Sequence, residues 1–132
     1  ELKYFAADWD FWLSVYEKKI LGAETEVILY HRRNHSNNVI SRNICKWPEV
    51  INLIIDRHPI FFSNKKRKRT AIYYVYEKLA RHYRTKRQRK KAAYYAKIAL
   101  ENGESTPALI EILKEEKMSR IRYVIRLVGK LI

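Results

Sequence analysis

The sequence predicts an all-α protein: a helical bundle with one long basic helix and extended helical arms. Gly and Pro occur only three times each in 132 residues, whereas β-sandwiches and barrels need many turns built from those residues. Apolar side chains recur at the three-and-four spacing of helix faces. The chain is 47% hydrophobic, enough to bury a core. We therefore expect a single all-helical domain over residues 1–132.

The first expected helix is amphipathic and covers residues 2–20, with Gly22 as its C-terminal stop. Its apolar face is rich in aromatic side chains. Core packing is the commoner use of such a face, but an exposed aromatic face would be a subunit contact. The candidate subunit-contact residues are Phe5, Trp9, Trp12 and Tyr16.

The segment before Pro59 gives weaker signals. Residues 24–33 fit a short helix or a strand, with the helix favoured, and residues 39–47 are ambiguous. Pro48 suits the first helical position. Pro59 should end that helix, because proline pushes the preceding His58 out of the α region.

A long basic helix is expected over residues 64–101, capped by Ser63 or Asn64 and followed by Gly103. Its middle, residues 84–91, contains no apolar side chain over slightly more than two turns. Either the helix breaks there, or this stretch lies against a partner other than protein.

The last expected helix is amphipathic and covers residues 106–131. Thr106 suits the N-cap, and Pro107 suits the first turn. Ser119 is an alternative start for a separate final helix.

Positive charge is concentrated in one segment. The chain has 28 Lys and Arg against 14 Asp and Glu, and residues 63–91 hold 13 of the basic residues but only one acid, Glu77. A soluble surface normally mixes the two signs, so this concentration indicates contact with a polyanion. The expected nucleic-acid-binding residues are Lys65, Lys66, Arg67, Lys68, Arg69, Arg81, Arg84, Lys86, Arg87, Arg89, Lys90 and Lys91.

Binding through such residues would be strong and salt-dependent, because each neutralised phosphate releases counterions. Phosphate contacts position a protein without reading sequence. Only Gln88 in residues 65–91 has an amide suited to reading bases. The tyrosines near the basic residues either stack on unpaired bases or pack a core with the hydroxyl at its rim, and the core is favoured.

No catalytic or cofactor-binding motif is found. With three glycines the chain contains no phosphate-cradling loop and no nucleophile elbow. Carboxylates for nuclease chemistry would have to come from the three aspartates or from scattered glutamates. His31 and His35 could face one ion on a helix, but no third ligand stands at a convincing spacing. We therefore expect a protein that is not an enzyme and has no cofactor and no metal site.

Three further features concern the setting of the protein. No run of ~18 apolar residues occurs, so no transmembrane helix is expected. Cys45 is the one cysteine, which excludes an internal disulfide. Scarce Gln, Met and Cys with abundant Lys, Glu and Arg are typical of a hyperthermophile.

A sequence-specific regulator with a helix-turn-helix is the alternative hypothesis. Residues 48–58 and the helix from residue 64 would be its two helices. The joining segment contains Pro59, Ile60, Phe61 and Phe62 in place of a tight glycine turn. A small enzyme acting on nucleic acid has no support from the residues.

In size, helix content, basicity and composition, the whole chain resembles the major coat proteins of filamentous double-stranded DNA viruses of hyperthermophilic archaea. The resemblance implies helical subunits, often two related coat proteins that pair, which wrap DNA and hold it in A form. Helix 64–101 would then face the DNA, and helices 2–20 and 106–131 would make protein contacts.

The partners implied are double-stranded DNA, further copies of the chain in a filament, and a second, related coat protein. The implied location is the virion, as part of the nucleocapsid. For the alternative regulator it is the archaeal cytoplasm.

Overall fold

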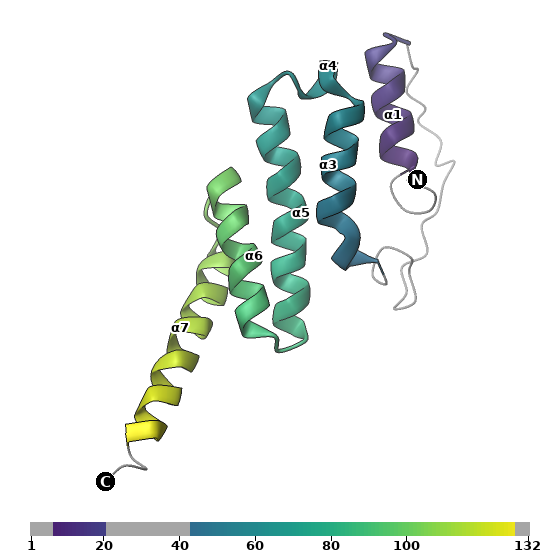
Figure 1. The fold of residues 1–132 in the computed structure, drawn as a ribbon. Helices are drawn as coiled ribbons and strands as arrows, with labels where there is room; N and C mark the ends of the chain where they lie inside the picture. The colour runs from purple at the N-terminus through teal and green to yellow at the C-terminus, as the bar shows by residue number, and fades with distance from the viewer. Residues whose placement is uncertain (1–6, 21–42, 129–132) are drawn as a thin grey trace, which may run out of the picture. The chain divides into compact units, whose positions relative to one another are not determined.

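The computed structural model describes residues 7–20 and 43–128, and no strand occurs in these two stretches (Figure 1). The all-α fold class is thus confirmed. The contacts divide the chain into two compact units, residues 1–68 and residues 69–132, whereas a single domain was expected from the sequence. The elements are α1 (Ala7–Glu17), the short 3₁₀ helix η1 (Ile44–Lys46), α3 (Trp47–Arg57), α4 (Pro59–Phe62), α5 (Lys65–Thr85), α6 (Arg89–Asn102) and α7 (Pro107–Val128).

Helix α1 lies within the predicted range and ends with a left-handed residue, Lys19, at φ 54°. The N–H groups of Lys19 and Ile20 donate to the carbonyl oxygens of Tyr16 and Val15, at 3.0 and 3.1 Å. This is the Schellman pattern, which satisfies the last carbonyl groups of a helix. The predicted stop at Gly22 lies outside the described residues.

Several other expectations fall outside the described residues: the first residues of helix 2–20, the short helix over residues 24–33, and the pair His31 and His35. Of residues 39–47, the described part forms η1 and the start of α3.

Helix α3 confirms two of the predicted boundaries. Pro48 lies in its first turn, and His58 leaves the α region at φ −122° and ψ 60°. Pro59 then begins the short helix α4, which was not predicted. A proline is tolerated there because the first N–H groups of a helix have no partner inside it. The buried face of α3 includes Ile51, Ile54 and Ile55.

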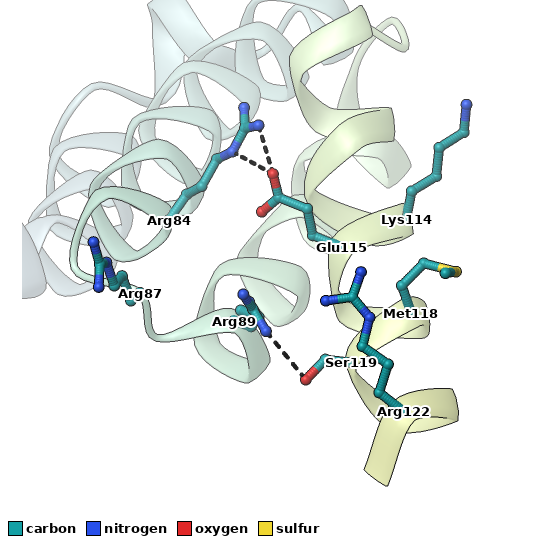
Figure 2. Close-up of a pocket in the computed structure, with 8 residues that line it drawn as sticks. All are labelled: Arg84, Arg87, Arg89, Lys114, Glu115, Met118, Ser119 and Arg122. Atoms are coloured by element: carbon teal, nitrogen blue, oxygen red, sulfur yellow. Dashed lines mark hydrogen bonds and ion pairs between the residues drawn. The ribbon is translucent and has the colours of Figure 1, made fainter. Parts of the chain in front are cut away.

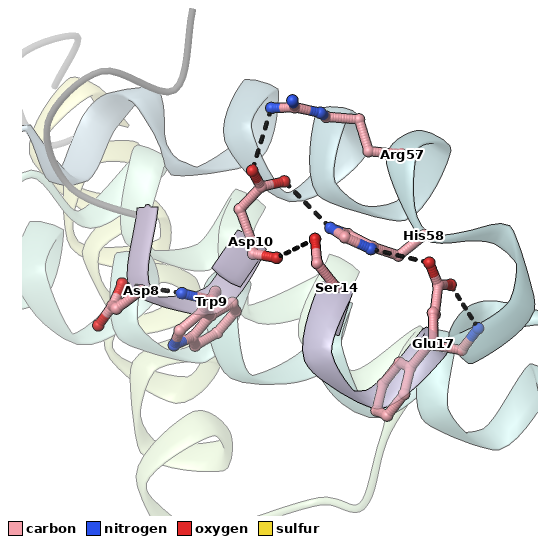
Figure 3. Close-up of polar contacts among 8 residues, drawn as sticks. Asp8, Trp9, Asp10, Ser14, Glu17, Arg57 and His58 are labelled. Carbon is pink, nitrogen blue, oxygen red and sulfur yellow. Dashed lines mark hydrogen bonds and ion pairs between the residues drawn. The ribbon is translucent and has the colours of Figure 1, made fainter. Parts of the chain in front are cut away.

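A buried histidine joins α1 to the end of α3 (Figure 3). His58 is 4% exposed. Its Nδ1 lies 3.1 Å from Oε2 of Glu17, and its Nε2 lies 3.0 Å from Oδ1 of Asp10. Ionised carboxylates only accept hydrogen bonds, so each ring nitrogen faces an acceptor. Arg57 adds an ion pair to Asp10 at 3.3 Å.

The same carboxylate of Glu17 also accepts a hydrogen bond from the backbone N–H of Phe61, at 2.9 Å. This bond, followed by the bond and charge of His58, lowers the pKa of Glu17 from its ordinary value of 4.5. Tyr16 packs edge-on against the ring of Phe61, with ring centres 5.1 Å apart. Polar and aromatic contacts together attach α1 to α4.

The predicted long basic helix is wrong, because the chain breaks between α5 and α6; the alternative of a break is confirmed. Arg87 adopts the left-handed conformation at φ 58°. Its N–H donates to the carbonyl oxygen of Arg84, and the N–H of Gln88 donates to that of Tyr83, both at 2.9 Å. This second Schellman pattern ends α5 without the glycine that usually marks such a stop.

The second unit has a core built largely from small side chains. Ala92, Ala96 and Ala99 of α6 pack with Ala80 of α5. Leu109 and Ile112 of α7 complete the buried cluster. Small residues let helix axes approach closely, since the distance between axes depends on the side chains at the contact.

Four tyrosines pack around this core: Tyr73, Tyr76, Tyr83 and Tyr95. Tyr83 and Tyr95 stack with ring centres 5.3 Å apart and an interplanar angle of 16°. The favoured interpretation of these four as core residues is therefore confirmed. Tyr74 and Tyr94, in contrast, are exposed.

The connection from α6 to α7 follows the predicted signals with one difference. Gly103 is the C-terminal cap of α6. A Cβ atom on Gly103 would lie 2.3 Å from Cδ2 of Tyr73, so the ring requires a residue without a side chain there. Pro107 begins α7, but the Oγ1 atom of Thr106 is buried with no hydrogen-bond partner among the described residues, so this hydroxyl does not cap the helix.

Helix α7 continues through Ser119 to Val128, so no separate final helix begins at Ser119. None of the helices described has the length and apolar character needed to cross a bilayer.

Candidate nucleic-acid interface

The first basic cluster occupies the start of α5. The Oδ1 atom of Asn64 accepts hydrogen bonds from the N–H groups of Lys66 and Arg67, at 2.9 and 3.4 Å, so Asn64 is the N-cap. The first turn contains no acid, and residues 63–70 are exposed. The positive end of a helix dipole disfavours cations. An anion bound at this end would relieve that repulsion.

Five of the predicted DNA-binding arginines make contacts within the protein. Arg67 donates from Nη1 to the hydroxyl of Tyr16 at 3.0 Å and stacks over the ring of Phe61, 4.7 Å from its centre. Arg69 donates to the carbonyl oxygen of Glu101 at 3.0 Å, near the C-terminal end of α6. Both arginines therefore have a structural role in the free protein.

Two more of the predicted arginines form ion pairs. Arg81 binds Glu77 one turn earlier on α5, at 2.8 Å. Arg84 donates from Nε and Nη2 to Oε1 of Glu115, at 3.2 and 2.6 Å, and from Nη2 to Oε2 of Glu111, at 2.9 Å. The bonds to Glu115, and then those to Glu111, raise the pKa of Arg84 above its ordinary value. Arg84 thus links α5 to α7, and its charge is largely compensated.

The lysines of the predicted set have few internal contacts. Lys91 lies 5.3 Å from the ring centre of Tyr83, a cation–π distance. Five more are exposed, and none has a side-chain hydrogen bond or ion pair within the described residues; they are Lys65, Lys66, Lys68, Lys86 and Lys90. An ammonium group on a flexible stem acts as a hydrated point charge, suited to non-specific phosphate contact.

A hollow of about 660 Å³ opens beside the break between α5 and α6 (Figure 2). Five cations and one carboxylate line it. Arg89 donates across it to the hydroxyl of Ser119 on α7, at 3.4 Å. The lining residues are Arg84, Arg87, Arg89, Lys114, Glu115, Met118, Ser119 and Arg122.

Three of these cations, Arg84, Arg87 and Arg89, belong to the set predicted from the sequence, but Lys114 and Arg122 of α7 do not. Lys114, Met118 and Arg122 stand four residues apart and therefore share one face of α7. That spacing was a usable signal for a basic face. It could not show that this face lies beside the turn after α5.

The predicted subunit-contact residues differ in exposure and in their contacts within the protein. Trp9 packs edge-on against Trp47, with ring centres 5.5 Å apart, and is 37% exposed. Trp12 is 65% exposed, and its neighbour Phe11, which was not predicted, is 59% exposed. Tyr16 is half exposed and accepts the bond from Arg67. Phe5 lies outside the described residues.

No group of three or more metal-ligating side chains occurs in the described part of the chain. Comparisons of the chain with protein-family models, with curated proteins and with solved structures found no match.

Proposed function

We propose that this chain is a structural protein that binds the phosphate backbone of double-stranded DNA without reading its sequence. The observation that carries the proposal is the set of exposed cations at the two ends of α5. One cluster, at the start of α5, contains Lys65, Lys66 and Lys68. The other, beside the break between α5 and α6, contains Lys86 and Lys90, and neither cluster contains an acid. Such uncompensated charge is unfavourable in a free protein and favourable beside a polyanion.

We further propose that the chain packages a viral genome as the coat protein of a helical filament. This step depends on the resemblance in composition and size, and on the exposed aromatic side chains of α1. Phe11 and Trp12 are large, apolar and more than half exposed, which suits contact with another protein. The partner would be a second copy or a related coat protein, and the location the virion.

The alternative, a helix-turn-helix regulator in the archaeal cytoplasm, is less well supported. A helix-turn-helix joins its helices by a turn of about 3–4 residues. Here the short helix α4 fills the connection between α3 and α5. Specific regulators also need side chains that read base edges, and lysines dominate the exposed part of the clusters.

The test is electron microscopy of the protein mixed with random linear double-stranded DNA. We expect regular filaments of constant diameter. Isolated particles at a few positions would indicate the regulator, and bare DNA at low salt would contradict binding by this chain alone.

Binding assays at several salt concentrations provide the quantitative test. About eight cations without strong internal pairing predict a slope of roughly −7 in log K against log salt. A slope of −1 or −2 would contradict the proposal. Random and selected duplexes should bind within about tenfold, whereas a preference of ~10³ or more would favour the regulator.

A further inference from the structure

The hollow beside the α5–α6 break has the charge and donors of an anion site. Its single carboxylate, Glu115, is already bonded to Arg84 (Figure 2). The side chains of Arg87, Lys114 and Arg122 have no hydrogen bond or ion pair among the described residues. Three full positive charges therefore remain uncompensated around one concavity.

The walls of the hollow are well fixed. The backbone of Arg87 is held by the bonds that end α5, in a left-handed conformation that glycine adopts more easily. The ion pairs of Arg84 with Glu111 and Glu115 attach α7 to α5. Lys114 and Arg122 stand two turns apart on α7 and flank the hollow along that helix.

These groups match phosphate better than other anions. The planar guanidinium fork binds two phosphate oxygens at once, and charge-assisted bonds of this kind are the stronger class. The hydroxyl of Ser119 adds a neutral donor beside Arg89. A single carboxylate ligand would leave most of the cations unpaired, so a ligand with several phosphate groups fits best.

We propose that this hollow binds consecutive phosphate groups of one nucleic-acid strand, with α7 supplying Lys114 and Arg122 as a second wall. The inference rests on the proposed DNA-binding function and adds a defined binding site for the phosphate backbone. The lysines at the start of α5 then contribute diffuse attraction, whereas the hollow fixes the position of the backbone.

The first experiment uses inorganic tripolyphosphate as the probe and isothermal titration calorimetry as the measurement. The variant Lys114→Gln/Arg122→Gln removes two cations of the hollow. It is compared with the control variant Lys97→Gln/Lys117→Gln. Lys97 and Lys117 are exposed on α6 and α7 and do not line the hollow, so the control removes the same charge. Gln keeps a high helix propensity, and circular dichroism verifies folding.

We expect saturable binding by the wild type, weakened at least tenfold in Lys114→Gln/Arg122→Gln and changed less than twofold in the control. Equal weakening in the two variants would overturn the site, because it would show that only total charge matters. Absence of saturable binding by the wild type would overturn it as well.

The second experiment measures the salt dependence of binding to a random duplex of about 20 base pairs. Loss of two phosphate contacts should reduce the salt slope by about 2 in Lys114→Gln/Arg122→Gln and leave the control slope nearly unchanged. Tight duplex binding with the same slope in both variants would overturn the hollow and leave the proposed function standing. Tripolyphosphate binding without duplex binding at low salt would overturn the proposed function and the nucleic-acid assignment of the hollow.

Discussion

Charge reversal at the start of α5 should have opposite effects on folding and on DNA binding. Lys65 and Lys66 occupy the first two positions of the helix after the N-cap Asn64, and both are exposed. Acids are favoured in the first turn and cations are disfavoured, by about 0.3–1 kcal/mol each at low ionic strength. The double variant Lys65→Glu/Lys66→Glu exchanges two unfavourable interactions for two favourable ones.

The size of the effect on folding follows from that range. Exposed charges lie at its lower end, so each reversal should contribute about 0.6 kcal/mol, or about 1.2 kcal/mol for the pair. For a chain of 132 residues this corresponds to a rise of ~3–5 °C in melting temperature. The rise should largely disappear at about 1 M salt, where the Debye length falls to ~3 Å.

The effect on DNA binding should have the other sign. Two lost phosphate contacts reduce the salt slope by about 2, which corresponds to a roughly 50-fold loss of affinity at about 0.1 M salt. The matched control is Lys97→Glu/Lys117→Glu. It changes the net charge equally at exposed positions in the middle of α6 and α7, where the helix dipole has little influence.

Differential scanning fluorimetry at several salt concentrations and fluorescence anisotropy with a random duplex measure the two effects. A lower melting temperature in Lys65→Glu/Lys66→Glu would refute the electrostatic reasoning about the first turn. Loss of DNA affinity no greater than in the control would show that the start of α5 does not contact the backbone.

Four further predictions concern the fold. Gly103→Ala should destabilise the second unit by about 1–3 kcal/mol, since its methyl group would overlap the ring of Tyr73; an unchanged urea midpoint would contradict that contact. Arg87→Gly should stabilise the protein by about 1 kcal/mol, because it relieves the left-handed conformation, while it weakens tripolyphosphate binding; a lower melting temperature would count against strain at this turn. The lowered pKa of Glu17 means that its contribution is present above its ordinary pKa of 4.5 and is lost as pH falls through the lower folded value. The melting temperature of the wild type should therefore drop more steeply below about pH 4.5 than that of Glu17→Gln, and parallel curves would exclude this linkage. Replacement of His58 by Ala should leave two carboxylates without their shared donor and expose α1 to proteolysis, which limited trypsin digestion would detect; equal digestion rates would refute that role.

Local signals in the sequence predicted the fold class and many helix ends. Asn64, Gly103 and Pro107 act within a few residues of their own positions, and the structure places helix boundaries at each of them. The break after α5 was harder to locate, since Arg87 occupies a left-handed position that usually holds glycine. The absence of apolar side chains in residues 84–91 fitted two outcomes equally, a break in the helix or contact with a partner other than protein.

The position of the positive charge along the chain follows from the residues alone, because net charge is a sum over residues. Which of those charges remain available for a partner depends on how the helices pack against one another. Arg84 meets Glu111 and Glu115 across 27 and 31 residues of chain, and Lys114 and Arg122 reach the same hollow from α7. Such pairings depend on how α6 and α7 pack through the alanines of the core, and periodicity along a single helix does not specify which neighbour its polar face will meet.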